Sequence, residues 1–357
     1  MNKSINRVAI AVIGALSAFS GAAMADSPQI YGRMEIAVTN SDNGFTTQNG
    51  KSGTILENNF SRLGVKGSEK ISDGLEVLYR MEFQVNSAHL EGDSKVFKPR
   101  NTYVGLKSDA GTVLIGRNDT VMKTSKGTAE AFALTNAAYN RMIAGQDRKA
   151  DGITYYSPKI ADLITINATY LMDDNYAEYD DNGARTDVNE KQYAVSLVGG
   201  DKKLKKQPYY FAAAYNTIGG VDAYRGVAQY KIGQLKLGGL FQNTKSQTVE
   251  TKEGNSYFFS AVYNLNGVNL KAEIGKDEAG FGKYFKNNTA TTSTQYNNAT
   301  DVDINSLVIG ADYRIAKSTM IFGHYAQYDG EYRDTNTGNM IELKDDKIFT
   351  VGVRYDF

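Results

Sequence analysis

The stretch that decides the fold is the C-terminal nonapeptide FTVGVRYDF, residues 349–357. Its odd positions are all apolar or aromatic, and its even positions carry Thr, Gly, Arg and Asp. A period of two places successive side chains on opposite faces, which is the pattern of a β-strand with one apolar and one polar face. The apolar face of this strand needs a partner surface to cover it.

The same alternation recurs along the chain. In residues 74–85 the odd positions are apolar or aromatic, whereas the even positions carry mainly Glu, Arg and Gln. Taken along the whole sequence, the pattern predicts sixteen strands, near residues 28–39, 57–67, 74–85, 100–108, 111–118, 151–158, 163–172, 190–198, 208–217, 222–232, 234–243, 255–265, 267–276, 303–315, 318–328 and 347–357.

The connections between these strands alternate in length. Tight turn sequences such as Asp73-Gly74 and Asn266-Gly267 are followed by long polar stretches, among them 40–57, 118–150 and 277–303. Short turns at one end and long loops at the other describe an antiparallel up-and-down arrangement of strands.

Composition narrows the possible classes. The 357 residues include no Cys, and 40 basic residues balance 40 acidic ones. A disulfide scaffold is therefore excluded, and the neutral charge does not support a nucleic-acid partner. The mean hydropathy of −0.42 leaves little room for several transmembrane helices, each of which needs about 20 apolar residues.

The one long apolar run lies at the N-terminus. Residues 1–25 contain Lys3 and Arg7, then an apolar segment from Val8 to Phe19, then Ala23-Met24-Ala25. This order is that of a cleaved secretory signal peptide. We therefore expect a mature chain of residues 26–357 that forms one domain outside the cytoplasm.

The number of strands also predicts the environment of the sheet. An open sheet of this size would expose unpaired edges, and a closed one encloses a lumen too wide for side chains to fill. The polar face then lines water and the apolar face meets lipid, so the expected fold is an all-β transmembrane barrel. The alternative is a secreted β-sandwich or β-propeller with one buried apolar face.

Several short motifs occur in a recognisable order. They are Tyr31-Gly32-Arg33, the segment SRLGVKGSE at 61–69, the segment RNTYVGL at 100–106, the segment GTVLIGR at 111–117 and the C-terminal VGVRYDF at 351–357. In this order the chain resembles the Gram-negative general porins, which are trimeric sixteen-stranded barrels of the outer membrane. The resemblance extends over essentially the whole mature chain.

This resemblance implies a channel for passive diffusion of small hydrophilic solutes and ions. It also implies short periplasmic turns, long extracellular loops, a homotrimer in outer-membrane lipid, no cofactor and no enzymatic activity. Tyr355 and Phe357 are then the C-terminal signal for the barrel-assembly machinery. Two alternatives stay open: a substrate-selective porin, and a barrel whose long loops act mainly as an adhesion or receptor surface.

The resemblance further places the third long loop, about 118–150, inside the barrel as a constriction. Its acidic residues are Asp119, Glu130 and Asp147, and its basic residues are Lys123, Lys126, Arg141, Arg148 and Lys149. The segment 128–142 is rich in helix formers and favours a short helix.

The resemblance also implies a ladder of basic side chains on the wall opposite this loop. Strand parity places its first four members on the lumen face: Arg33, Arg62, Lys66 and Arg80. Arg100 and Arg117 belong to family motifs, but parity puts them on the apolar side unless a bulge or a strand end re-aims them. A basic wall facing an acidic loop would set a transverse field across the pore. The alternative is that these cations only solvate the wall or pair with nearby glutamates.

Three further features bear on selectivity and chemistry. In this resemblance, Thr154 aligns with a position at which many relatives carry a basic residue, and the departure implies a weaker positive wall. Loop 173–190 holds seven acidic residues and one Arg, which favours cations weakly or gives poor selectivity. Only His89 and His324 are present, so a catalytic pair with Ser or Asp is not expected.

Overall fold

A computed structural model describes residues 28–86, 96–172, 191–289 and 297–357. The predicted signal peptide, residues 1–25, and the acidic loop 173–190 lie outside these described residues. No helix within the described ranges is long and apolar enough to cross a membrane.

Almost all of the described secondary structure is strand. The strands are β1 (Gln29–Ser41), β2 (Gly53–Asn58), β3 (Arg62–Ser72), β4 (Leu75–Val85), β5 (Phe97–Ser108), β6 (Gly111–Asp119), β7 (Arg148–Tyr156), β8 (Ile164–Leu171), β9 (Tyr193–Gly200), β10 (Tyr209–Asn216), β11 (Val221–Ile232), β12 (Leu235–Ser246), β13 (Glu253–Leu265), β14 (Val268–Asp277), β15 (Ala299–Arg314), β16 (Thr319–Asp334), β17 (Met340–Glu342) and β18 (Asp346–Asp356).

These segments make sixteen spanning strands. β2 and β3 pair with successive parts of β1, so they form one strand that is interrupted near Phe60. β17 is a short piece that pairs with the outer end of β16, beyond the pairing of β16 with β18. The sixteen strands predicted from the alternation are confirmed, with ends that differ by a few residues.

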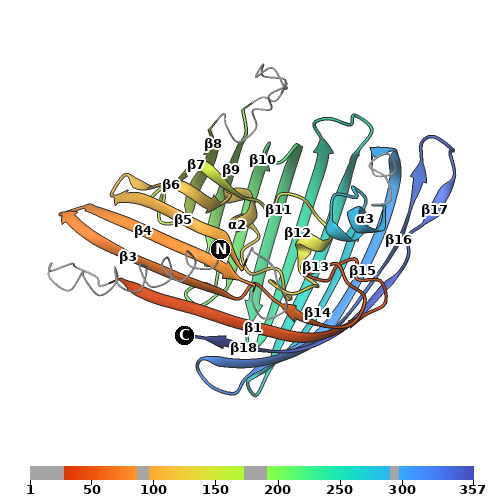
Figure 1. Cartoon of the computed structure of the whole chain (residues 1–357). Coiled ribbons are helices and arrows are strands. Elements are labelled where there is room, and N and C mark those ends of the chain that lie inside the picture. Colours follow the sequence, from red (N-terminus) through yellow and green to blue (C-terminus); the bar gives the residue numbers. More distant parts are fainter. Residues whose placement is uncertain (1–27, 87–95, 173–190, 290–296) are drawn as a thin grey trace, which may run out of the picture.

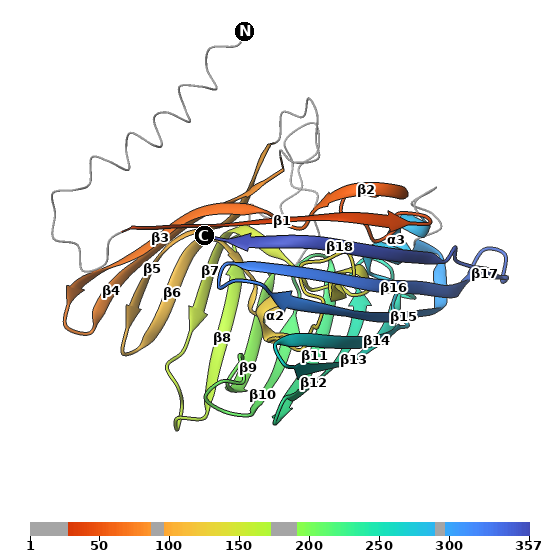
Figure 2. The ribbon, with the colours of Figure 1, turned by 90° about the horizontal axis from the view of Figure 1, so that it is seen from below.

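The sheet closes on itself through its first and last strands. β1 pairs antiparallel with β18 from Arg33 opposite Asp356 to Ser41 opposite Ile348, and every other spanning strand pairs with its sequence neighbours. Figures 1 and 2 both show β1 beside β18. Within the described part of the chain, closure gives each spanning strand a partner on both sides, which removes the open sheet edges on which another chain could pair.

The two faces of the barrel have opposite character, as parity predicted. On β1 the outward residues Ile30, Met34 and Val38 are each more than half exposed, whereas the inward Glu35 and Thr39 are buried. An apolar exterior around a polar interior is the arrangement that a lipid environment requires.

Connections differ at the two ends. At one end of the barrel most connections between consecutive strands are short turns, as at 73–74 and 266–267. The opposite end carries long loops, one of which contains α3 (Lys283–Asn288). The turn between β9 and β10, residues 201–208, is an exception because it is longer and buries Leu204.

Candidate functional site

The third long loop, residues 120–147, lies inside the barrel and is called the constriction loop below. It contains α2 (Val121–Ser125), which Figures 1 and 2 place within the ring of strands, and the short 3-10 helix η1 (Tyr139–Arg141). Val121 and Met122 are fully buried against the wall. Helix α2 begins after Thr120, whose hydroxyl accepts the backbone N–H of Lys123 at 3.2 Å.

The predicted helix over 128–142 is wrong for most of its length. Only Tyr139–Arg141 are helical, and the remainder is a series of turns. Apolar side chains on all sides of this segment are buried, including Ala129, Phe132 and Tyr139. The wall packing of these side chains overrides the helical propensity that the composition suggests.

Both arms of the constriction loop are tied to the barrel by Arg225 of β11. Its guanidinium donates to the carbonyl oxygen of Met122 at 2.7 Å and to that of Ala144 at 3.2 Å. Its Nε donates to Gln242 Oε1 at 2.8 Å. Arg225 therefore fixes the distance between the two segments by which the loop enters and leaves the lumen.

The apex of the loop is held by Asn136. Its Nδ2 donates to Thr350 Oγ1 at 2.9 Å and to the carboxylate of Glu57, and its Oδ1 lies 2.7 Å from His324 Nε2. Asn136 is fully buried. These partners belong to β2, β16 and β18, so the apex is fastened beside the junction that closes the barrel.

The basic wall is organised around Glu82 of β4. Its carboxylate lies 2.6 Å from Arg100 Nε, 2.9 Å from Arg80 Nη2 and 3.7 Å from Arg62 Nε. Three guanidinium groups therefore share one carboxylate, which is only 2% exposed. Because one carboxylate faces three guanidinium groups, these ion pairs leave a net positive charge on this part of the wall.

Arg100 reaches the lumen through a β-bulge. Met81 pairs with Thr102 and Phe83 with Pro99, so Glu82 alone faces two residues of β5, Arg100 and Asn101. The extra residue re-aims the Arg100 side chain from the outer face to the inner one.

Arg117 is placed differently. It pairs with Thr102 and shares the parity of Ile115, which is 58% exposed on the outer face. The nearby irregularity inserts an extra residue into β7 instead of β6, between Gly152 and Lys149. Arg117 does not line the cavity beside the constriction loop.

Arg33 and Lys66 face the lumen but lie away from that cavity. Arg33 Nε donates to Asp356 Oδ1 at 2.8 Å and lies 3.5 Å from Glu35. The Lys66 ammonium lies 5.4 Å from the centre of the Tyr31 ring. Both residues belong to the lumen wall outside the narrow region.

The three acidic residues of the loop region do not form an opposing face. Asp119 borders the cavity but lies 2.9 Å from Lys123 and 3.0 Å from Arg148. Glu130 is buried and pairs with Lys126. Asp147 borders a different cavity, on the side of the long loops.

The space between loop and wall is a cavity of about 520 Å³. Among the residues that the structure describes, two acidic side chains line it, Glu82 and Asp119. Seven basic side chains of the described residues line it: Arg62, Arg80, Arg100, Lys123, Lys126, Arg148 and Lys202. Thr154 is buried in the wall outside this cavity, whereas Arg148 on the same strand supplies a cation to it.

Lys202 was missed by sequence reasoning because it belongs to a turn at the short-turn end. The run of four lysines at 202, 203, 205 and 206 is visible in the sequence, but nothing in the local pattern indicates that the turn folds inward. Among the described residues no cluster of His, Cys, Asp or Glu is arranged to hold a metal ion. His89 lies outside the described residues.

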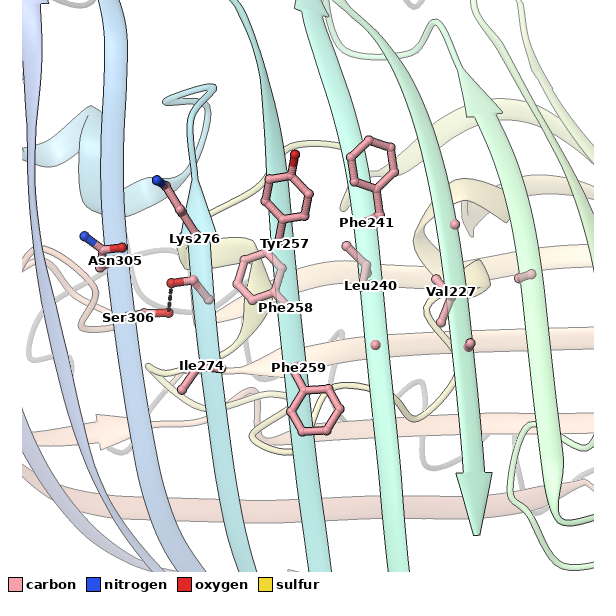
Figure 3. Close-up of a pocket in the computed structure, with 15 residues that line it drawn as sticks. Val227, Leu240, Phe241, Tyr257, Phe258, Phe259, Ile274, Lys276, Asn305 and Ser306 are labelled. Atoms are coloured by element: carbon pink, nitrogen blue, oxygen red, sulfur yellow. Dashed lines mark hydrogen bonds between the residues drawn. The ribbon is translucent and has the colours of Figure 1, made fainter.

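A second cavity, of about 790 Å³, is lined by residues of β10 to β15 and shares no lining residue with the cavity beside the constriction loop. Figure 3 shows Phe241, Tyr257 and Phe259 bordering it. These three side chains are among the exposed apolar residues of the membrane-facing surface.

Proteins with similar sequence include outer-membrane proteins and porins. A family model described as Gram-negative porin matches residues 9–333. The major outer membrane protein P.IB of Neisseria meningitidis serogroup B is 22% identical over 343 residues, which cover 92% of this chain and 96% of that protein. Outer membrane porin protein 32 of Delftia acidovorans is 26% identical, with 91% and 89% covered.

The fold is also shared with solved structures. The anion-selective porin from Comamonas acidovorans superposes with a TM-score of 0.67 at 17% identity, over 93% of this chain and all of that one. The match to the family model extends over most of the sequence, and the barrel has the polar lumen and apolar exterior of an outer-membrane channel. The chain therefore belongs to the Gram-negative porin family and forms a water-filled channel through which small hydrophilic solutes and ions diffuse across the outer membrane.

Proposed function

We propose that this channel prefers anions and that the cavity beside the constriction loop is its selectivity filter. The observation that carries the proposal is the charge of the lining, where seven basic side chains accompany two acidic ones in the described part of the chain. Charge of one sign in a narrow passage raises the local concentration of the opposite ion. The printed name of the Comamonas acidovorans relative, an anion-selective porin, agrees with this proposal.

The roles of the individual residues follow from their positions. Arg62, Arg80 and Arg100 provide the positive wall, and Glu82 holds their guanidinium groups in place. Lys123 and Lys126 add positive charge from the constriction loop. The acidic loop 173–190 lies outside the described residues, and screening limits the reach of an exposed charge to about 8 Å at physiological salt. We therefore assign selectivity to the cavity.

The preference is tested by the reversal potential of single channels in a planar bilayer under a KCl gradient. The wild-type potential is expected to have the sign of chloride preference. A quadruple variant, Arg62→Gln, Arg80→Gln, Arg100→Gln and Glu82→Gln, removes two net charges without stranding a carboxylate and is expected to reduce the preference. Lys66→Gln is the matched control, because Lys66 faces the lumen outside the cavity. A wild-type channel that prefers potassium, or shows no preference, would refute the proposal.

Four further assignments belong to the same proposal. The mature protein is residues 26–357 as one barrel domain, after removal of the signal peptide 1–25. It acts as a homotrimer with no enzymatic activity, and Tyr355 and Phe357 present the C-terminus to the barrel-assembly machinery. Conductance that increases in groups of three equal steps would support the trimer, and single isolated steps would contradict it.

A further inference from the structure

The turn between β9 and β10, residues 201–208, folds inward at the short-turn end of the barrel. Leu204 at its centre is 4% exposed and belongs to the same apolar cluster as Ala129 of the constriction loop and Tyr210 of the wall. The turn therefore packs beneath the constriction loop, whereas a turn that only joined two strands would lie in water.

Leu204 holds an unusual backbone conformation to reach this position. Its φ of 54° lies in the left-handed region, which is uncommon for a residue other than Gly. Such conformations persist only where surrounding contacts impose them, and they concentrate at functional positions.

Asp201 supplies those contacts. Its carboxylate accepts the backbone N–H groups of Lys203 at 2.9 Å, Lys205 at 2.7 Å and Lys206 at 2.6 Å. These hydrogen bonds lower the pKa of Asp201 to about 2. The carboxylate thus stays ionised and fixes the turn at physiological pH.

The consequence of this geometry is the position of Lys202. Its carbonyl oxygen accepts the hydroxyl of Thr128 at 3.0 Å, which ties the turn to the constriction loop. Its side chain lines the filter cavity together with Lys126 and the arginines of the wall. Lys203 belongs to the same turn but does not line the cavity.

We propose that the inward turn 201–208 is the periplasmic half of the selectivity filter and that Lys202 is a specificity-determining residue for anion passage. This inference rests on the proposed anion preference. The constriction loop and the arginine wall supply positive charge from two sides, and Lys202 adds a cation from a third element. The strained Leu204 and the Asp201 carboxylate serve to hold that cation in the passage.

The test compares Lys202→Gln with Lys203→Gln in the full-length channel by reversal potential under a KCl gradient. Removing one unit charge from a water-filled passage is expected to lower the chloride-to-potassium permeability ratio about two-fold. Lys203→Gln is expected to leave the ratio nearly unchanged, because Lys203 lies outside the cavity. Lys202→Glu is expected to lower the ratio further than Lys202→Gln does.

A fourth variant tests the positioning role of the turn. Asp201→Asn keeps Lys202 but weakens the acceptor for three N–H groups, so it is expected to reduce the ratio in the same direction with a broader spread of conductance levels. Thermal unfolding of each variant, followed by circular dichroism, checks that the barrel remains folded.

The outcomes separate the two proposals. A wild-type channel without chloride preference refutes the proposed function itself. A chloride-preferring wild type whose ratio is unchanged by Lys202→Gln refutes only the role of the turn. Equal shifts from Lys202→Gln and Lys203→Gln also refute it, because the effect then comes from charge at the periplasmic mouth.

Discussion

The ring of Phe357, the last residue of the chain, covers Gly32 near the start of β1. The two residues exchange backbone hydrogen bonds, with Gly32 N–H donating at 2.8 Å and Phe357 N–H donating at 3.1 Å. A Cβ atom at position 32 would lie 2.2 Å from Cζ of the Phe357 ring. The absence of a side chain at Gly32 thus allows the C-terminus to seal the barrel.

Gly32→Val is expected to weaken this closure, because the added side chain displaces the Phe357 ring. Overpacking of this kind costs about 1–3 kcal/mol. Refolding into detergent micelles, followed by the mobility of unheated samples on gels, would show slower closure and a lower midpoint in urea. Gly226→Val is the control, since a Cβ there meets nothing within 4 Å. Equal effects of both substitutions would mean that the ring contact has no special role.

Glu82→Gln is expected to increase anion preference and to lower stability. The substitution leaves Arg62, Arg80 and Arg100 without their shared carboxylate. The loss of stability should be about 1–3 kcal/mol, because water in the lumen partly screens the charges of this cluster. Urea titration and the reversal potential measure the two effects.

The control for this substitution is Glu76→Gln. Glu76 lies 2.9 Å from Lys107 in a more exposed pair outside the cavity. Glu76→Gln should change neither the stability nor the reversal potential appreciably. If Glu82→Gln leaves the reversal potential unchanged, the three arginines do not act on passing ions.

Asn136→Ala is expected to loosen the apex of the constriction loop. The variant removes the hydrogen bonds to Thr350, Glu57 and His324. Single-channel recordings should then show rapid fluctuation between conductance levels at constant voltage. Asn140→Ala is a suitable control, because the buried Asn140 Oδ1 has no hydrogen-bond partner within the described part of the chain. Quiet recordings from Asn136→Ala would show that other contacts alone hold the loop.

The buried Lys283, at the end of the barrel that carries the long loops, is expected to make the stability of the protein depend on pH. Burial and the nearby Arg141 lower the pKa of Lys283 to about 8, below the value of about 10.4 for an unfolded chain. The folded state therefore binds fewer protons than the unfolded state between these values. The cost of the buried charge is thus present in full below pH 8 and is relieved as pH rises towards 10.

The measurement compares thermal unfolding of the wild type with Lys283→Met at pH 7 and pH 10. The stability of the wild type relative to Lys283→Met should improve with pH. Lys283→Arg stays charged throughout and should show no such relative gain. A difference that does not vary with pH would mean that Lys283 is equally protonated in both states.

The strands of this protein and the direction of many of their side chains can be predicted from local sequence. Period-two alternation in segments such as 349–357 identified all sixteen strands, because a residue's side-chain direction in a strand depends only on its parity. The same parity placed Arg62 and Arg80 on the lumen face, where the structure also has them. Strand number then determined the environment, since a barrel this wide must hold water inside and meet lipid outside.

Tertiary structure decided the charge pattern of the pore. A bulge opposite Glu82 turns Arg100 inward, whereas Arg117 does not line the cavity beside the constriction loop. Whether an acidic residue acts on a passing ion depends on its partners, and Glu130 is buried against Lys126 while Asp119 lies between two cations. Lys202 lines the pore only because Leu204 packs under the constriction loop. Local alternation determines which way a strand residue points, but the electrostatic field of the lumen is a sum over side chains that are distant in sequence, and only the closed barrel brings those side chains together.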